Sequence, residues 1–142
     1  MFKLRHIGIR VRDLESMKNF FISNFNCKVK VEMREKGVFI DNLQGKKNVD
    51  VTTCKLIFDE SDNIIELLYY HDDKFSNQTP KLNYFGINHY AVTVKNLTSF
   101  YENMVAKGFV FTTNPIVSNN KKALCTFMYD IENNLIELVE EL

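Results

Sequence analysis

The stretch HIGIRVRDL, residues 6–14, returns 83 residues later as HYAVTVKNL, residues 89–97. Apolar residues alternate with other residues in both copies, which is typical of a half-buried strand. A second match links DESDNIIEL, residues 59–67, with DIENNLIEL, residues 130–138, and five of its nine positions are identical. The order of the two matches is the same in each half of the chain. The sequence therefore predicts an internal repeat of one supersecondary unit.

A helix is expected directly after the first strand of each copy. Asp13 and Asn96 stand at these points, and both residue types favour the N-cap of a helix. Apolar residues at helical spacing then predict helices over residues 14–25 and 97–107, the second of which ends at Gly108 as a C-cap.

The remainder of each copy favours strands. Stretches with β-favouring composition lie at residues 28–33, 38–43, 51–58, 109–113 and 123–129, and the repeated polar turns lead into a last strand in each copy. Each copy is therefore predicted to form a strand, a helix and about three further strands. A polar segment over residues 71–85, which contains Pro80, is the expected linker.

Composition narrows the class of protein. The chain has 142 residues with 18 basic and 18 acidic side chains, so its zero formal charge does not favour binding to nucleic acid or to an anionic membrane. The three cysteines form no CxxC pair, which argues against a disulfide framework or a cysteine zinc site. The start of the sequence lacks the apolar core of a signal peptide, and no apolar run has the length of a membrane span. We expect a single domain in the cytoplasm.

Two histidines and two glutamates stand out because they interrupt apolar strands at equivalent places. Alternation puts His6 and His89 on the strand face opposite the apolar residues that pack on the helix. Glu66 and Glu137 each lie between isoleucine and leucine, and a buried carboxylate without a partner is costly. If a pseudo-twofold axis relates the two copies, the four side chains converge.

The chemistry of this set points to a divalent metal. Two neutral imidazoles and two carboxylates suit Zn, Ni, Co, Mn or Fe, and the two negative charges neutralise the ion. Four protein ligands around an octahedral ion leave positions for water or substrate, which is typical of a catalytic site. Each residue taken singly also has a purely structural interpretation. His71, next to two aspartates, is expected at the surface, as is the lysine pair at residues 121–122, and the cysteines are expected to be buried.

These residues and motifs resemble the vicinal oxygen chelate superfamily, which includes glyoxalase I, methylmalonyl-CoA epimerase, extradiol dioxygenases, and fosfomycin- and bleomycin-resistance proteins. The resemblance covers nearly the whole chain. It implies an α+β fold over residues 1–142, with two βαβββ modules at about residues 1–72 and 84–142 that form curved mixed sheets around a cleft. It also implies a homodimer, although the sequence leaves open whether the cleft is built within one chain or across two.

Within the superfamily, the His-Glu-His-Glu set is most similar to glyoxalase I. That likeness implies that His6, Glu66, His89 and Glu137 bind the metal (Ni, Zn, Co or Mn). It implies a lyase or isomerase that converts the hemithioacetal of a 2-oxoaldehyde and a thiol into a 2-hydroxyacyl thioester through a metal-stabilised enediolate. Glu137, with Glu66 as the second choice, would move the proton. Arg10 lies where the family has an arginine near the carboxylate of the thiol cofactor.

Two departures bear on the substrate. Tyr70 lies where many glyoxalases have an asparagine that binds glutathione, and residues 118–122 lack the Gly-Gly of the usual glyoxalase loop. Methylmalonyl-CoA epimerase, which commonly has Gln at the place of Glu66, stays open as an alternative, as do another metal-dependent isomerase and a non-catalytic binding or resistance protein. Extradiol dioxygenases are generally longer, and bleomycin-binding proteins lack the metal ligands.

Overall fold

The computed structural model describes residues 3–59, 61–71 and 85–142. The chain divides into two compact units, Met1–Ser76 and Asn77–Leu142. None of the helices in the described ranges combines the length and the apolar character that a membrane span requires.

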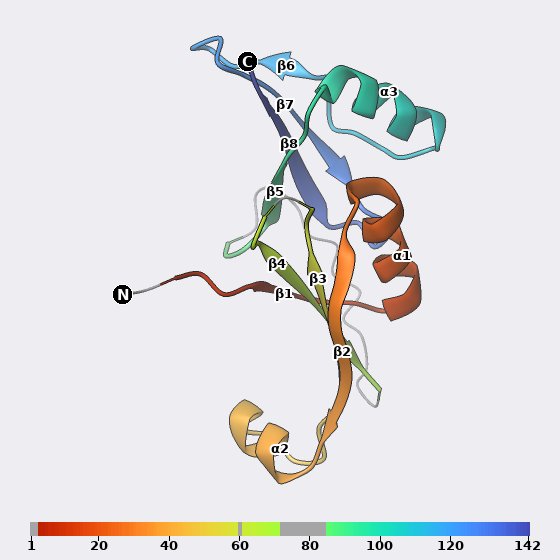
Figure 1. The fold of residues 1–142 in the computed structure, drawn as a ribbon, viewed down its shortest axis with the longest axis vertical. Coiled ribbons are helices and arrows are strands. Elements are labelled where there is room, and N and C mark those ends of the chain that lie inside the picture. The colour runs from red at the N-terminus through yellow and green to blue at the C-terminus, as the bar shows by residue number, and fades with distance from the viewer. Residues whose placement is uncertain (1–2, 60, 72–84) are drawn as a thin grey trace. The chain divides into compact units, whose positions relative to one another are not determined.

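The first unit is a four-stranded mixed sheet with two helices (Figure 1). Its elements are β1 (Ile7–Arg10), α1 (Leu14–Phe25), β2 (Lys28–Lys36), α2 (Val38–Gln44), β3 (Asp50–Ile57) and β4 (Ile64–Tyr70). The strand order is β1-β4-β3-β2, in which β1 runs parallel to β4 and the other pairs are antiparallel.

The second unit repeats this topology with a single helix. Its elements are β5 (His89–Thr93), α3 (Leu97–Ala106), β6 (Ile116–Val117), β7 (Ala123–Tyr129) and β8 (Leu135–Glu141). The order β5-β8-β7-β6 again places the first strand parallel to the last. Both units therefore have the predicted βαβββ arrangement, and the α+β fold class is confirmed.

The two helices that follow the first strands begin as predicted. Asp13 accepts a hydrogen bond from the Ser16 amide at 3.0 Å and caps α1. Asn96 accepts one from the Ser99 amide at 3.2 Å and caps α3. In each case the side chain satisfies an amide that has no partner inside the helix, which stabilises the helix start. Gly108, with φ of 88°, follows the end of α3.

Each unit has its core between its helix and one sheet face. In the first unit, α1 packs on β3 and β4 through an apolar face that contains Leu14, Met17, Phe20 and Phe21. In the second unit, the buried residues include Leu97, Met104, Met128, Ile136 and Leu138. The helix-facing side chains of the strands are buried in this core. The residues that break the apolar pattern therefore lie on the opposite face of each sheet.

The repeated turn before the last strand is built differently in the two units. In the second unit, Asp130 is 4% exposed and accepts hydrogen bonds from the Glu132 and Asn134 amides. Burial raises the pKa of Asp130, against the effect of these hydrogen bonds. In the first unit, Asp59 instead forms an exposed ion pair with Lys28. The shared sequence therefore marks a turn in both units without the same contacts.

Two strand predictions were wrong. Residues 38–43 belong to helix α2, which lies beyond the end of β2 (Figure 1). Gly37 and Gly45 bound this helix at positive φ, and Asp41 ties it to β3 by accepting the Val49 amide at 2.8 Å. Its buried Ile40 packs with Val49 and Val51, a tertiary contact that outweighs the β propensity of a short apolar segment.

Residues 109–113 contribute only one isolated bridge, from Phe111 to Met128, and the corresponding strand β6 lies at Ile116–Val117. The predicted linker starts at His71 and ends at Phe85, and its interior falls outside the described residues.

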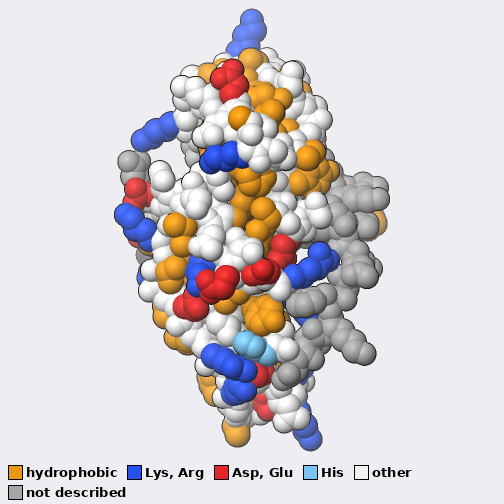
Figure 2. Space-filling model, turned by 90° about the vertical axis from the view of Figure 1, so that its right-hand side faces the viewer, with side chains coloured by type: hydrophobic (Ala, Val, Ile, Leu, Met, Phe, Trp, Pro, Cys, Tyr) orange, Lys and Arg blue, Asp and Glu red, His pale blue; other side chains and the backbone are white. Residues whose placement is uncertain are grey.

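Charges of both signs are interspersed on the face drawn in Figure 2, where Lys and Arg side chains lie among Asp and Glu side chains. This distribution agrees with the zero formal charge of the chain.

Candidate functional site

The first unit brings His6 and Glu66 together. Glu66 in β4 is paired with Gly8 in β1, and His6 lies two residues before Gly8, so that alternation places its side chain on the same face as Glu66. His6 Nε2 lies 3.0 Å from Glu66 Oε2, with side chains that are 28% and 12% exposed. The structure therefore brings these two candidate residues together.

The second unit repeats the arrangement with His89 and Glu137. Glu137 in β8 is paired with Ala91 in β5, and His89 again lies two residues earlier on the parallel strand. His89 Nε2 lies 3.5 Å from Glu137 Oε2, and the two side chains are 36% and 29% exposed. The two His/Glu pairs thus have the same register in the two sheets.

The geometry within each pair is compatible with metal ligation. Ligands at about 2.1 Å from one ion lie roughly 3.0 to 3.4 Å apart when they are neighbours in octahedral or tetrahedral geometry. The two nitrogen–oxygen distances, 3.0 Å and 3.5 Å, are close to that range, and the atoms that face each other are a nitrogen and a carboxylate oxygen. In donor type and in spacing, each pair fits a divalent ion.

Asn88 orients His89 for such a role. The two side chains meet at 2.6 Å, between His89 Nδ1 and Asn88 Oδ1. Because an amide oxygen only accepts, Nδ1 carries the proton and the lone pair of a neutral ring is on Nε2, which faces Glu137. The ring also contacts Phe127 edge to face, with centroids 5.3 Å apart. A hydrogen-bonded Nδ1 is the usual support of a histidine ligand.

His6 has no such support. Its Nδ1 is buried and lacks a hydrogen-bond partner among the described residues. Its neighbour Glu66 is also bound by Lys55, whose Nζ lies 3.1 Å from Oε1. The first pair therefore differs from the second in that a lysine ammonium contacts its carboxylate.

The predicted substrate-binding residues Arg10 and Tyr70 contact each other. The Arg10 guanidinium lies over the Tyr70 ring, 5.0 Å from its centroid, a cation–π geometry. Tyr70 Oη donates to Gln44 Oε1 of α2 at 3.2 Å. Both residues follow the alternation of Gly8 and Glu66 along β1 and β4, so they share the sheet face of the first His/Glu pair.

The three cysteines differ in burial. Cys27 and Cys54 are buried as predicted, whereas Cys125 is half-buried. Cys125 alternates with Phe127 along β7 and lies on the face of Glu137. Burial raises the pKa of its thiol, and the nearby Glu137 carboxylate adds to this effect.

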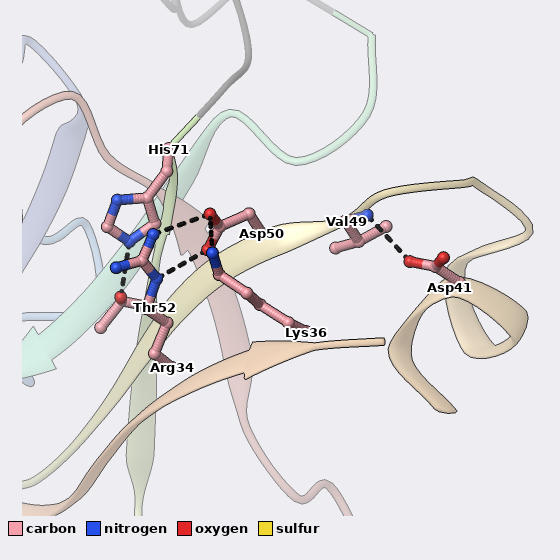
Figure 3. A network of polar contacts seen from close by, with 7 residues as sticks. All are labelled: Arg34, Lys36, Asp41, Val49, Asp50, Thr52 and His71. Carbon is pink, nitrogen blue, oxygen red and sulfur yellow. Dashed lines mark hydrogen bonds and ion pairs between the residues drawn. The ribbon is translucent and has the colours of Figure 1, made fainter. Parts of the chain in front are cut away.

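The third histidine belongs to a separate network (Figure 3). His71 Nε2 lies 2.8 Å from Thr52 Oγ1, near the ion pairs of Asp50 with Arg34 and Lys36, both at 2.7 Å. The hydrogen bonds from Arg34, and then those from Lys36, hold the pKa of Asp50 well below its ordinary value. This network joins β2 and β3 and includes neither candidate histidine.

Sequence alternation identified the four candidate ligands but missed their neighbours. Lys55, Phe127 and Asn88 were not predicted, although the first two are paired in register with Glu66 and Glu137. Strand pairing is the signal that would have found them. Within the described residues of either unit, no three His, Cys, Asp or Glu side chains gather as a metal cluster, and the joining of the two pairs stays a prediction.

The topology of the two units agrees with comparisons to known proteins. Residues 5–129 match the family model of the glyoxalase/bleomycin resistance protein/dioxygenase superfamily. The chain belongs to this superfamily. No curated protein matches its sequence.

Solved structures of this superfamily share the fold. A glyoxalase family protein from Bacillus cereus superposes with a TM-score of 0.89 at 17% identity and covers 100% of this chain and 95% of its own. A glyoxalase I variant from Zea mays has a TM-score of 0.69 at 21% identity and covers 99% of this chain and 47% of its own. A fosfomycin resistance protein from Listeria monocytogenes has a TM-score of 0.67 at 17% identity, covering 100% and 95%. At sequence identities of 17% to 21%, these structural similarities show a shared fold and nothing further.

Proposed function

We propose that this superfamily member is a metal-dependent lyase or isomerase of the glyoxalase I type. The observation that carries the proposal is the repetition of one His/Glu pair at the same register in both sheets. A single pair has many structural explanations. Two pairs in equivalent places, on the sheet faces opposite α1 and α3, favour a shared chemical task.

His6, Glu66, His89 and Glu137 would hold the ion, which we propose to be Ni, Zn, Co or Mn. When bound, the ion supplies positive charge that polarises the substrate oxygens and stabilises negative charge on them. The protein's part is to present neutral imidazole nitrogens, and Asn88 does so for His89 by accepting a hydrogen bond from Nδ1–H.

The carboxylates perform the proton transfer in this proposal. The substrate is a hemithioacetal, and its isomerisation moves one proton from the carbon that bears sulfur and hydroxyl to the neighbouring carbonyl carbon, while the hydroxyl proton passes to the former carbonyl oxygen. Glu137 takes the proton and returns it to the second carbon, with Glu66 as the second choice. The product is a 2-hydroxyacyl thioester of the same composition, so no further reactant is needed.

Arg10 and Tyr70 would bind the substrate on the face of the first unit. The Tyr70 ring supports the guanidinium at 5.0 Å, and a guanidinium suits a carboxylate of the thiol portion. Tyr70 has no amide to offer such a thiol, so glutathione and other low-molecular-weight thiols are compared as substrates. We propose that the protein works as a homodimer on this small molecule.

The test is turnover with and without metal. Protein stripped with a chelator is given methylglyoxal with glutathione or with another low-molecular-weight thiol, and thioester formation is followed by absorbance. We expect no activity in the stripped protein and recovery with Ni, Co, Mn or Zn. Failure with every thiol and every metal would remove the glyoxalase activity.

Two further measurements separate the alternatives. An epimerase exchanges the α-proton of an acyl-CoA, which proton NMR in deuterated water detects. A binding or resistance protein associates with a small molecule without converting it.

A further inference from the structure

Lys55 contacts Glu66, the carboxylate of the first His/Glu pair. Lys55 is paired in register with Glu66 across β3 and β4, and both side chains leave the sheet on the same face. Its Nζ lies 3.1 Å from Glu66 Oε1, and the side chains are only 24% and 12% exposed. The contact is therefore partly shielded from solvent, where charges interact more strongly than at an exposed surface.

The two oxygens of Glu66 have different partners. Oε2 faces His6 Nε2 at 3.0 Å, while Oε1 faces the Lys55 ammonium. A carboxylate held in this way offers one oxygen toward an ion next to His6. The second oxygen is already bound to a positive charge.

The equivalent position in the second unit has no charge. Phe127 is paired in register with Glu137 as Lys55 is with Glu66, and the Phe127 ring contacts His89 instead. Among the described residues, no Lys or Arg forms an ion pair with Glu137, whose Oε2 lies 3.5 Å from His89 Nε2. The two units therefore have a carboxylate at the same position. Among the described residues, Glu66 has an ammonium neighbour and Glu137 has none.

We propose that Lys55 is a positioning residue that restricts Glu66 to one ligating oxygen and weakens the binding of a divalent cation by the first pair. Two effects act in the same direction. The ammonium occupies the oxygen that a bidentate ligand would use, and its charge repels a nearby cation. The inference rests on the proposed function in that it takes His6 and Glu66 as metal ligands.

The chain offers a matched control. Lys28 forms an ion pair with Asp59 in the same unit at 2.9 Å, with side chains that are 73% and 54% exposed. Replacing Lys28 by methionine changes the charge of the protein by the same amount, but away from Glu66. Lys55→Arg retains the charge at the site, and Lys55→Gln serves as a second neutral variant if Lys55→Met folds poorly.

The experiment is titration of the chelator-stripped protein with Zn²⁺ and with Co²⁺, measured by calorimetry and by the visible spectrum of bound Co²⁺. We expect Lys55→Met to bind Zn²⁺ at least about tenfold more tightly than the unmodified protein. Lys28→Met and Lys55→Arg should bind Zn²⁺ within about threefold of the unmodified protein. The Co²⁺ spectrum of Lys55→Met should differ from the others, because Glu66 gains a second ligating oxygen.

Equal or weaker Zn²⁺ binding by Lys55→Met would overturn the proposal, as would an equal gain in Lys28→Met. The absence of binding in both the unmodified protein and the neutral variants would also overturn it. Binding that appears only in the neutral variants would support it. If metal binds but no thiol supports turnover, the glyoxalase function fails while the role of Lys55 stands.

Discussion

Glu66 and Glu137 occupy the same position in their two sheets. Each lies on the last strand of its unit and is paired with a small residue of the parallel first strand, Gly8 or Ala91. On the antiparallel side the neighbours differ, since Glu66 faces a lysine and Glu137 faces a phenylalanine. The two carboxylates therefore share a position in the sheet but differ in the charge of the side chain beside them.

Replacing Glu137 by glutamine should greatly slow proton transfer while the fold is retained. The side chain keeps its size and is 29% exposed, so the loss concerns its ability to take a proton. We expect kcat to fall by about a hundredfold to ten-thousandfold. Activity and circular dichroism check the result, with Glu141→Gln at the exposed end of the same strand as the control. Full activity in Glu137→Gln would exclude Glu137 as the base.

Replacing Asn88 by alanine should weaken metal binding. The change removes the acceptor, 2.6 Å from His89 Nδ1, that fixes the tautomer and the orientation of the ring. Loss of such a support typically lowers metal affinity about 10-fold to 100-fold. Zn²⁺ titration checks this effect, and Asn88→Asp, which retains an acceptor oxygen, should restore most of the affinity. Unchanged affinity in Asn88→Ala would show that His89 needs no support.

Two substitutions of Tyr70 should separate its ring from its hydroxyl. Tyr70→Phe keeps the ring under Arg10 and loses the 3.2 Å hydrogen bond to Gln44, so KM should change little and stability should fall by about 1 kcal/mol. Tyr70→Leu also removes the cation–π contact, and KM should rise about 2-fold to 30-fold with a smaller change in kcat. Equal KM values in both variants would contradict a role of Arg10 and Tyr70 in substrate binding. Steady-state kinetics and urea unfolding supply both readouts.

Asp50 should make stability depend on pH in the acidic range. Arg34 and Lys36 lower its pKa below the ordinary value of 3.8, so the unfolded chain binds more protons there than the folded protein. The contribution of Asp50 is complete above about pH 5 and is lost as the pH falls through the folded pKa.

Asp50→Asn should therefore lower the urea midpoint at pH 7, and its gap to the unmodified protein should narrow at pH 3. Asp59→Asn, which breaks the exposed pair with Lys28, is the control and should have little effect at either pH. A constant gap for Asp50→Asn at both pH values would contradict this account.

Much of the fold was predictable because its signals are local. The caps Asp13 and Asn96, the helical spacing after them and the alternation of the strands each depend on neighbours in the chain. Residues 38–43 were predicted as a strand because the segment is short and apolar, and local propensity separates helix from strand poorly in such a segment. The packing of Ile40 on Val49 and Val51, which favours the helix, connects separate elements.

The sequence by itself determined the repeat, the superfamily and the side of each strand on which His6, Glu66, His89 and Glu137 lie, because strand alternation has a strict period of two. Only the tertiary structure decided which side chains meet these residues. Register between strands depends on the packing of the whole sheet, so the contact of Lys55 with Glu66 and that of Phe127 with His89 follow from strand pairing. The repeat thus predicted equivalent places for the two His/Glu pairs, and the strand pairing gave the pairs different neighbours.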